Sequence, residues 1–215
     1  MCLKKIYTKT FGFAGFLSRE LKTGWKIIDV GCGKNSPLKD VSKKLYKVGL
    51  DYYPEYIKKA KIKSIHQKYI CQNINEINLK NNSFDAAISI EVIEHLTKKQ
   101  GLKLIKNMNN AAKYKIILTT PNGFLPTYAG SEDNPQETHV SGWETKDFKK
   151  LGFNVKGVNG FKFFWTIDKG NAVIKSPRII FLPLKLLTEP ISILFPKYAF
   201  QLFCVKKLNK NIKKK

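Results

Sequence analysis

The chain has 215 residues, 43% of them hydrophobic, with 39 lysines and arginines against 16 acidic residues. This length suits one domain with a substantial core, and the apolar fraction indicates a globular protein. The four cysteines, at positions 2, 32, 71 and 204, are far apart and form no CxxC pair. They argue against a zinc ribbon or a disulfide framework and for a reducing compartment. No signal-peptide pattern opens the sequence, so we expect a cytoplasmic protein.

The net charge of +23 would attract nucleic acid, anionic lipid head groups or acidic substrates. Lysine is spread along the chain, with runs at 58–63 and 206–215. Asparagine and isoleucine are also abundant, so a genome that favours lysine codons explains the charge equally well. The charge by itself therefore names no partner.

Residues 26–38, KIIDVGCGKNSPL, are the most informative stretch. The β-branched run predicts a buried strand with Asp29 at its carboxyl end. Gly31 and Gly33 allow a sharp turn and close approach to the backbone, and Ser36 is typical of a helix N-cap. A strand, a glycine loop and a helix form the first unit of a nucleotide-binding α/β sheet, whose ligands lie outside the carboxyl ends of the strands.

Strands and helices alternate along the rest of the chain, which predicts a largely parallel sheet. Further strands are expected over 46–50, 69–71, 84–90, 115–119, 153–158 and 200–206. Helices are expected over 1–24 as an N-terminal helical cap, and over 37–45, 54–61, 91–108 and 146–151.

Asp51 ends the second strand, about twenty residues after Gly33. A carboxylate at this place commonly binds a ribose, because it accepts hydrogen bonds from both hydroxyls. Capping of the helix over 54–61 is an alternative role for Asp51, and the two are compatible. Ser36 stands where the third glycine of a dinucleotide fingerprint would fall, which argues against a pyrophosphate ligand.

An apolar insertion, residues 161–197, separates the last two strands. In its second half, from Arg178, three prolines, a lysine and a glutamate divide the sequence into apolar runs far shorter than the ~20 residues that cross a bilayer. It is either a cap over the substrate cleft, which we favour, or an interfacial hairpin on a membrane. Residues 124–142 are expected to form an active-site lid, and 209–215 a basic tail.

Five strings resemble, in this order, the class I S-adenosylmethionine-dependent methyltransferases: IIDVGCG, VGLD, NNSFDAAISIEVIEHL, IILTTPN and HVSGWETKDFKKLGF. The resemblance is nearest to the small enzymes of ubiquinone and menaquinone biosynthesis. It implies S-adenosyl-L-methionine as the cofactor and a single methyltransferase domain over 1–208. The implied fold is α/β: a Rossmann-like, doubly wound, mostly parallel seven-stranded sheet with an antiparallel last strand.

The resemblance also implies roles for individual residues. Asp29 would hold the ammonium end of the cofactor, and the backbone at Gly31 and Gly33 would lie against its methionine part. Asp51 would bind the ribose hydroxyls, with Tyr52 beside the adenine.

Four further positions follow from the same resemblance. Asn73 stands where the family often has an aspartate for the adenine amino group, and its carbonyl can accept the same bond. Ile74 would offer its backbone N–H to the ring, and Glu91 would face the cofactor and the transferred methyl group. Asn35 replaces the third glycine of the family's loop, which a left-handed backbone would tolerate.

Methyl transfer is an in-line displacement, so the protein must align the acceptor and, for an oxygen nucleophile, remove its proton. The candidates for that proton are Glu94, His95 and His139. Glu91 and His95 are four residues apart, which would place them on one helical face. Packing or loop orientation is the alternative role for both histidines.

Glu91, Glu94, His95 and His139 also resemble the two-Glu, two-His metal set of the small-RNA 3′-terminal 2′-O-methyltransferases. Such ligands suit a divalent metal, but the match around His139 is loose, and the expected site holds none.

The expected function is methylation of a small-molecule or lipid-linked acceptor, with peripheral contact to an anionic membrane at its inner face. The first alternative is metal-assisted RNA 2′-O-methylation, which the positive charge would fit. The second is a non-catalytic binding module on the methyltransferase fold.

Overall fold

A computed structural model describes residues 10–74, 76–77, 79–126, 137–168 and 171–209. Hydrogen bonds order seven strands as β3-β2-β1-β4-β5-β9-β6. Their bounds are β1 (Lys26–Val30), β2 (Tyr46–Asp51), β3 (Lys68–Cys71), β4 (Phe84–Ile90), β5 (Ala112–Pro121), β6 (Asn154–Phe161) and β9 (Ala199–Lys207). Strand β1 is parallel to β2 and β4, β2 is parallel to β3, and β9 is antiparallel to β6. The predicted Rossmann-like sheet with its antiparallel last strand is confirmed.

The chain divides into two compact units. The first holds the described residues up to Ile90, together with Leu102–Ile117 and the described residues from Lys206 onward. In this unit α3 (Pro54–Ile62) packs against β2 and β3, and α2 (Phe13–Glu20) packs against the 3-10 turn η1 (Pro37–Asp40). The second unit holds Glu91–Gly101 and the described residues of Leu118–Val205.

Strand β1 is the centre of the first unit. Its apolar residues Ile27, Ile28 and Val30 have no exposed surface. Burial on both faces explains why this parallel strand is a continuous apolar run and does not alternate. The register places Asp29 opposite Gly49 of β2 on one side and Ile88 of β4 on the other. The acid of the glycine loop is therefore enclosed between two neighbouring strands.

Two predicted helices are wrong. The helix expected over 37–45 is only the four-residue turn η1, because Val41 is already extended. The helix expected over 91–108 is divided into the 3-10 turn η2 (Ile93–His95) and α4 (Lys98–Ala111). Thr97 and Gln100 form a reciprocal pair of N-terminal hydrogen bonds, so the α-helix starts only there. Glu91 and His95 consequently do not share the face of one α-helix.

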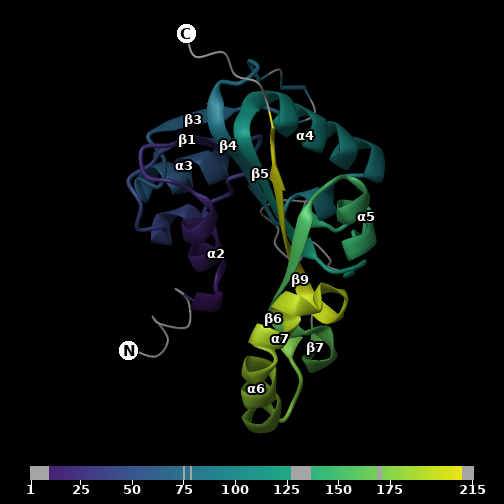
Figure 1. Ribbon diagram of the computed structural model, residues 1–215. Coiled ribbons are helices and arrows are strands. Elements are labelled where there is room, and N and C mark those ends of the chain that lie inside the picture. Colours follow the sequence, from purple (N-terminus) through teal and green to yellow (C-terminus); the bar gives the residue numbers. More distant parts are fainter. Residues whose placement is uncertain (1–9, 75, 78, 127–136, 169–170, 210–215) are drawn as a thin grey trace. The chain divides into compact units, whose positions relative to one another are not determined.

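The second unit contains the apolar insertion, which consists of regular elements (Figure 1). After the turn η4 (Lys162–Phe164), β7 (Trp165–Asp168) and β8 (Asn171–Ile174) pair as an antiparallel hairpin. The helices α6 (Arg178–Leu187) and α7 (Glu189–Leu194) and the turn η5 (Pro196–Tyr198) lead into β9. Both helices contact β6. Most side chains of α6 are exposed, which gives no support to the interpretation of the insertion as a cap.

The remaining helix of this unit, α5 (Thr145–Lys150), matches the prediction closely and begins with a capping box formed by Glu144 and Asp147. Residues 127–136 of the expected lid lie outside the described residues, as do 210–215 of the expected tail and residues 1–9 of the expected N-terminal cap. None of the described helices combines the length and the apolar character that a membrane crossing requires.

Candidate functional site

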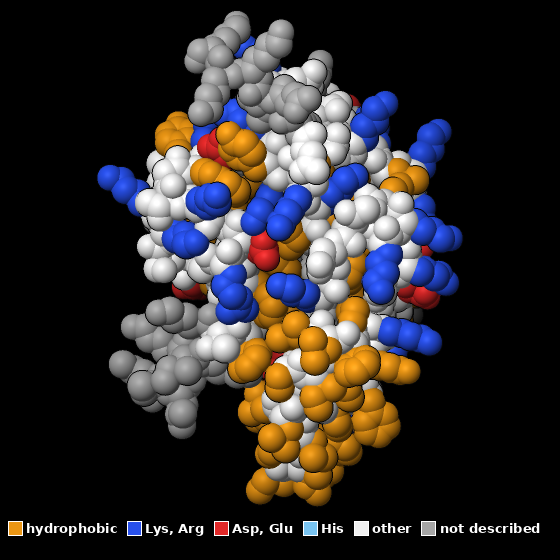
Figure 2. Space-filling model, in the orientation of Figure 1, with side chains coloured by type: hydrophobic (Ala, Val, Ile, Leu, Met, Phe, Trp, Pro, Cys, Tyr) orange, Lys and Arg blue, Asp and Glu red, His pale blue; other side chains and the backbone are white. Residues whose placement is uncertain are grey.

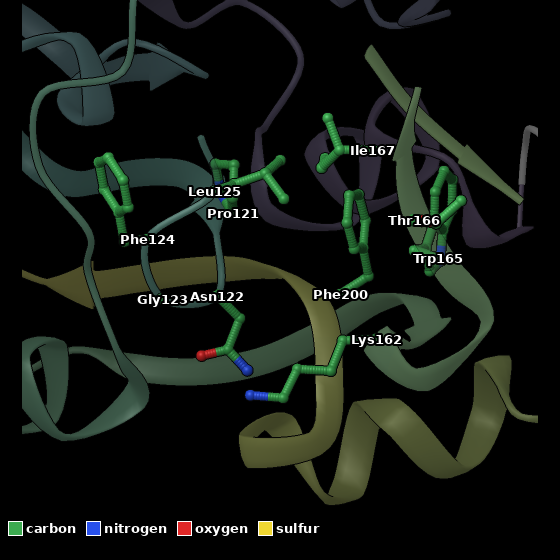
Figure 3. A pocket seen from close by; sticks show the side chains of 10 residues that line it. All are labelled: Pro121, Asn122, Gly123, Phe124, Leu125, Lys162, Trp165, Thr166, Ile167 and Phe200. Atoms are coloured by element: carbon green, nitrogen blue, oxygen red, sulfur yellow. The ribbon is translucent and has the colours of Figure 1, made fainter. Parts of the chain in front are cut away.

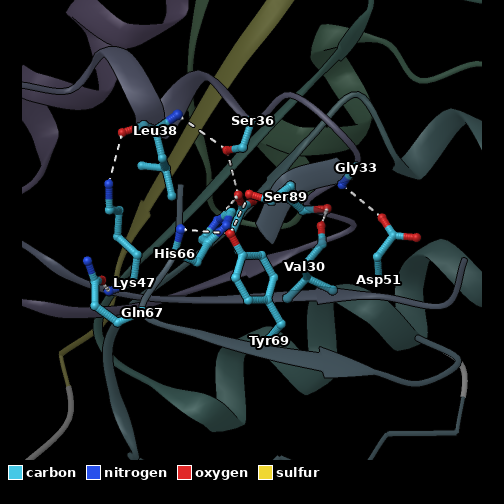
Figure 4. Close-up of polar contacts among 12 residues, drawn as sticks. Val30, Gly33, Ser36, Leu38, Lys47, Asp51, His66, Gln67, Tyr69 and Ser89 are labelled. Atoms are coloured by element: carbon cyan, nitrogen blue, oxygen red, sulfur yellow. Dashed lines mark hydrogen bonds and ion pairs between the residues drawn. The ribbon is translucent and has the colours of Figure 1, made fainter. Parts of the chain in front are cut away.

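The carboxylate of Asp29 joins three segments of the first unit. Figure 4 labels its two side-chain partners, Ser36 and His66. Its Oδ2 accepts hydrogen bonds from Ser36 Oγ at 2.6 Å and from His66 Nε2 at 2.9 Å. The Ser36 hydroxyl also accepts from Leu38 N at 3.2 Å, which confirms its predicted role as the N-cap of η1. Asp29 is buried, and these donors compensate the cost of removing a carboxylate from water. The glycine loop is therefore held at both ends by one side chain.

The glycine loop itself turns through left-handed backbone at Gly31 (φ +73°) and Gly33 (φ +56°). The amide groups of Gly31 and Cys32 both donate to Leu50 O, at 2.8 and 2.9 Å, which ties the loop to β2. A Cβ built at Gly33 would meet nothing within 4 Å, so the space above this residue is open. Asn35 is not among the described non-glycine residues with positive φ, so the family's third glycine position is not left-handed here.

Asp51, at the end of β2, points back toward the same loop. Its Oδ2 accepts from Gly33 N at 2.8 Å and its Oδ1 accepts from Tyr53 N at 3.0 Å. Burial raises the pKa of Asp51, and these two backbone donors partly oppose that effect. The N-cap of α3 is Tyr53 and not Asp51, so the carboxylate lies between the loop and the start of the helix.

Asp29, Gly33 and Asp51 lie together at the carboxyl ends of β1 and β2. Tyr52 follows Asp51 and is half-buried. Asn73 is exposed, and its Nδ2 lies 3.4 Å from Glu76 Oε1. Ile74 is buried next to it.

In the second unit Glu91 has a strained backbone and a fully bonded carboxylate. Its φ is +53°, which is uncommon for a residue with a side chain. Oε1 accepts from Thr119 Oγ1 and Oε2 accepts from Gln201 Nε2, both at 2.6 Å. Burial raises the pKa of Glu91 to about 7 although both hydrogen bonds favour the ionised form. Glu91 can therefore exchange a proton near neutral pH.

Glu94 is buried more deeply, and only one of its two carboxylate oxygens has a hydrogen-bond partner among the described residues. Its Oε2 accepts from Thr120 Oγ1 at 3.0 Å, but its Oε1 has no hydrogen-bond partner among the described residues. Burial, together with the nearby charge of Glu91, raises the pKa of Glu94 well above its ordinary value. An unpartnered buried carboxylate oxygen is costly, and this atom can carry a proton or coordinate a cation.

His95 and His139 stand edge to face, with ring centroids 4.8 Å apart. The Nδ1 atoms lie 3.2 Å from Thr138 O and 2.7 Å from Leu125 O respectively. Since a carbonyl can only accept, each Nδ1 carries the hydrogen, and Nε2 of the neutral ring keeps the lone pair. Burial lowers the pKa of both histidines, and His95 lowers that of His139 further. Both rings are therefore mainly neutral at pH 7.

Ligand atoms of Glu94, His95 and His139 all lie within 4.8 Å of one another. Nitrogen and oxygen ligands of this kind suit a divalent transition metal. The carbonyl groups that hold each Nδ1 correspond to the outer hydrogen bonds that orient histidine ligands in metal sites. The unpartnered oxygen of Glu94 completes a set that fits a metal ion. Glu91, the fourth member of the predicted set, has both of its oxygens bonded to Thr119 and Gln201.

A cavity of about 350 Å³ lies at the end of β5 (Figure 3). It is lined by Pro121, Asn122, Gly123, Phe124, Leu125, Lys162, Trp165, Thr166, Ile167 and Phe200. Trp165 and Phe200 stack with ring centroids 4.1 Å apart and form an aromatic wall. Hydrogen bonds link the cavity lining to the histidine cluster. Thr120, which precedes the lining residue Pro121, donates to Glu94, and the carbonyl of the lining residue Leu125 accepts from His139.

Asn122, which lines this cavity, also connects the end of β5 to the end of the insertion. Its Nδ2 lies 3.0 Å from Pro196 O and 2.9 Å from the carbonyl oxygens of Lys197 and Ala199. Sequence reasoning missed Asn122, and it missed His66, Thr119, Thr120 and Gln201 as well. Each of them acts through a partner that is distant in the chain, and the only local signal was the position of three of them in the string IILTTPN.

Comparison with known proteins agrees with this architecture. Residues 28–115 match the family model described as a methyltransferase domain. The human probable tRNA methyltransferase 9B is 36% identical over 91 residues, which is 42% of this chain. The chain spans only 19% of the length of that relative.

Solved structures are similar over nearly the whole chain. A chain of the complex between the Haloferax volcanii Trm112 methyltransferase activator and a putative methyltransferase superposes with a TM-score of 0.58 at 12% identity, covering 99% of this chain and 95% of that one. Magnesium protoporphyrin IX methyltransferase from Synechocystis, with S-adenosylhomocysteine bound, gives a TM-score of 0.53 at 14% identity, covering 96% and 87%. At these identities the similarity concerns the fold.

Proposed function

The chain carries a class I methyltransferase domain, and from this premise we propose that it transfers a methyl group from S-adenosylmethionine to a lipid-linked or other largely apolar acceptor. When bound, S-adenosylmethionine supplies a methyl group already activated on a sulfonium. The protein's residues then have two tasks, which are to hold the donor and to align and deprotonate the acceptor.

The observation that carries the proposal is the arrangement around Gly33. The space above this residue is open, and Asp51 lies beside it with a carboxylate suited to two ribose hydroxyls. Asp29 would orient the loop toward the methionine part, while its own Oδ2 stays bonded to Ser36 and His66. Tyr52, Asn73 and Ile74 would then surround the adenine, in the roles expected from the resemblance.

Glu94, His95 and His139 would handle the acceptor. Neutral imidazoles with free Nε2 lone pairs can accept the proton of an acceptor hydroxyl at pH 7. The same three residues would hold a divalent cation if one is required, and a cation there would favour the ionised form of the acceptor oxygen.

The aromatic cavity supports an acceptor with an apolar body. Trp165 and Phe200 would pack against that body, and Lys162 would pair with an anionic group on it. A purified sample incubated with methyl-labelled S-adenosylmethionine and separate pools of lipids, polar metabolites and RNA tests this. Label in the lipid pool is expected, and label in the polar pool alone would exclude the lipid-linked acceptor.

RNA is the second candidate acceptor. It is favoured by the net charge of +23 and by the partial similarity to a probable tRNA methyltransferase. Label found only in RNA, with a rate that falls steeply as salt is added, would establish this alternative.

Calorimetric titration with S-adenosylmethionine tests the donor site directly. The wild-type chain should bind, and Asp51→Ala should weaken binding by about tenfold or more, because charge-assisted hydrogen bonds are lost. Asp40→Ala is the matched control, since Asp40 is an exposed acid in the same unit. No binding by the wild type would favour a non-catalytic module on this fold.

A further inference from the structure

The segment from Arg178 to Tyr198 has an inverted distribution of side chains. The buried ones are polar: Lys185, Glu189 and Ser192. The Lys185 ammonium pairs with the Glu189 carboxylate, and Ser192 Oγ donates to Glu189 O at 2.8 Å. By contrast, ten large apolar side chains of this segment are exposed. Helices of proteins in water show the opposite arrangement.

The exposed apolar side chains extend around most of α6. Ile179 is 83% exposed and Leu187 is 69% exposed, and Leu182 lies between them. Together with their exposed neighbours they cover an arc of roughly 200°, at about 100° per residue. Figure 2 shows the hydrophobic side chains gathered over this part of the second unit. A broad apolar arc of this kind is typical of a helix that lies in the lipid interface with its apolar face among the acyl chains.

The charges around the segment favour an anionic surface. Residues 161–198 contain six basic residues, at 162, 169, 175, 178, 185 and 197, and two acidic ones, at 168 and 189. The acid at 189 is neutralised by its buried partner, and Arg178 and Lys197 are exposed at the two ends of the segment. Basic residues beside an apolar helix are attracted to anionic lipid head groups.

A second apolar feature adjoins the helices. An open hollow of about 640 Å³ is lined by Phe161, Phe163, Phe195 and Tyr198, together with Lys162. Tyrosine is typical of the level of lipid head groups, and phenylalanine and lysine are typical of the apolar and polar faces of interfacial segments. The hollow shares Lys162 with the aromatic cavity, so it could receive the apolar part of an acceptor from a lipid surface.

We propose that α6, α7 and η5 insert their apolar side chains into the interfacial layer of an anionic lipid bilayer. The ten residues of α6 extend for about 15 Å, which suits a helix lying in the interface and not one crossing it. The inference deepens the proposed function, because it assigns the source of the acceptor to the membrane surface. It does not require methyl transfer, so it can be tested separately.

Cosedimentation of the full chain with vesicles tests the proposal. Vesicles of phosphatidylcholine with one-third phosphatidylglycerol should retain the wild type, and added salt should weaken the binding. The triple variant Ile179→Ser, Leu187→Ser, Leu194→Ser should lose about tenfold or more of the partition constant. Ile62→Ser is the matched control, because Ile62 of α3 is also 83% exposed but belongs to the first unit. This control should bind as the wild type does.

Three outcomes would overturn the proposal. One is equal binding by the triple variant and the wild type, and another is equal loss in Ile62→Ser. The third is absence of vesicle binding together with a concentration-dependent dimer that the triple variant abolishes in sedimentation velocity, which would assign the surface to a second copy of the chain. Calorimetry with S-adenosylmethionine on the same samples separates failure of membrane binding from failure of the donor site, since all variants should bind the donor normally.

Discussion

Nε2 of His66 lies 2.9 Å from Oδ2 of Asp29, with both side chains buried. His66 precedes β3, while Asp29 is the last residue but one of β1, so this hydrogen bond connects the strand before the glycine loop to the far side of β2. Nδ1 of His66 has no hydrogen-bond partner among the described residues. The Asp29 carboxylate has one donor from the end of its own glycine loop, Ser36, and one from a distant segment, His66, so its orientation depends on tertiary packing as well as on the loop.

Replacing His66 by alanine should destabilise the first unit and disorder the glycine loop. Asp29 would lose one of two side-chain donors while staying buried, which costs about 1–3 kcal/mol of the free energy of unfolding. Denaturant unfolding measures the stability, and calorimetry measures the affinity for S-adenosylmethionine. Lys68→Ala, an exposed change two residues away, serves as the control. Unchanged affinity for S-adenosylmethionine in a folded His66→Ala protein would contradict the proposed orienting role.

Gly49 should tolerate no side chain. A Cβ there would lie 2.9 Å from His66 Nδ1 and 3.0 Å from Cys32 Sγ, so Gly49→Ala should cost about 1–3 kcal/mol through overpacking. A double-mutant cycle gives a sharper check. Combining Gly49→Ala with His66→Ala should recover part of the loss, because the contacted ring is gone. Strict additivity of the two losses would mean that the clash is not with His66.

Glu91 should make stability depend on pH. Its pKa is raised from 4.5 to about 7, so between these values the folded state binds a proton that the unfolded state does not. The free energy of unfolding should therefore fall as pH rises from about 4.5 to about 7, by about 1–3 kcal/mol from this group. The two histidines, whose pKa values are lowered, contribute with the opposite sign below pH 6.5. Glu91→Gln should remove the Glu91 contribution and also lower the pKa of Glu94, which the charge of Glu91 raises. An unchanged difference between pH 5 and pH 7.5 would disprove the assignment.

Divalent cations should stabilise the chain through Glu94, His95 and His139. Adding manganese chloride to a chelator-treated sample at about a hundred times the dissociation constant should add about 2.7 kcal/mol to the free energy of unfolding. His139→Ala should abolish this gain, while Asp168→Asn, which removes an exposed acid of the same unit, should keep it. If manganese still stabilises His139→Ala, the metal binds at another site. No gain in the wild type would leave the histidines as a metal-free pair.

The sheet could be predicted from sequence because its information is local. Runs such as FDAAISI are bounded by turn residues and gave β4 with the correct ends, and Ser36 with Pro37 correctly marked the start of η1. The length of an element was less predictable. The turn η1 ends at Asp40 because Val41 becomes extended, and α4 starts late because Thr97 and Gln100 cap it.

The candidate site was only half predictable for a similar reason. Asp29, Asp51, Glu94, His95 and His139 were identified because they fall within short motifs. Their partners lie elsewhere in the chain: His66 is 37 residues from Asp29, and Gln201 is 110 residues from Glu91. Buried polar side chains of this kind are satisfied by tertiary contacts, which one sequence does not reveal.

The two N–H groups of the Asn122 amide are shared among three carbonyl oxygens at the end of the insertion, and these contacts fix the position of the insertion relative to β5. The same side chain forms a wall of the aromatic cavity and holds the chain where it leaves α7. If α6 and α7 lie at a constant depth in the lipid, the Asn122 amide also determines the distance between the cavity and the acyl chains. Acceptors would then be selected by length as well as by shape, because only a reactive group carried to that height reaches the histidine pair. The position of Asn122 would then determine the length of acceptor that the enzyme can methylate.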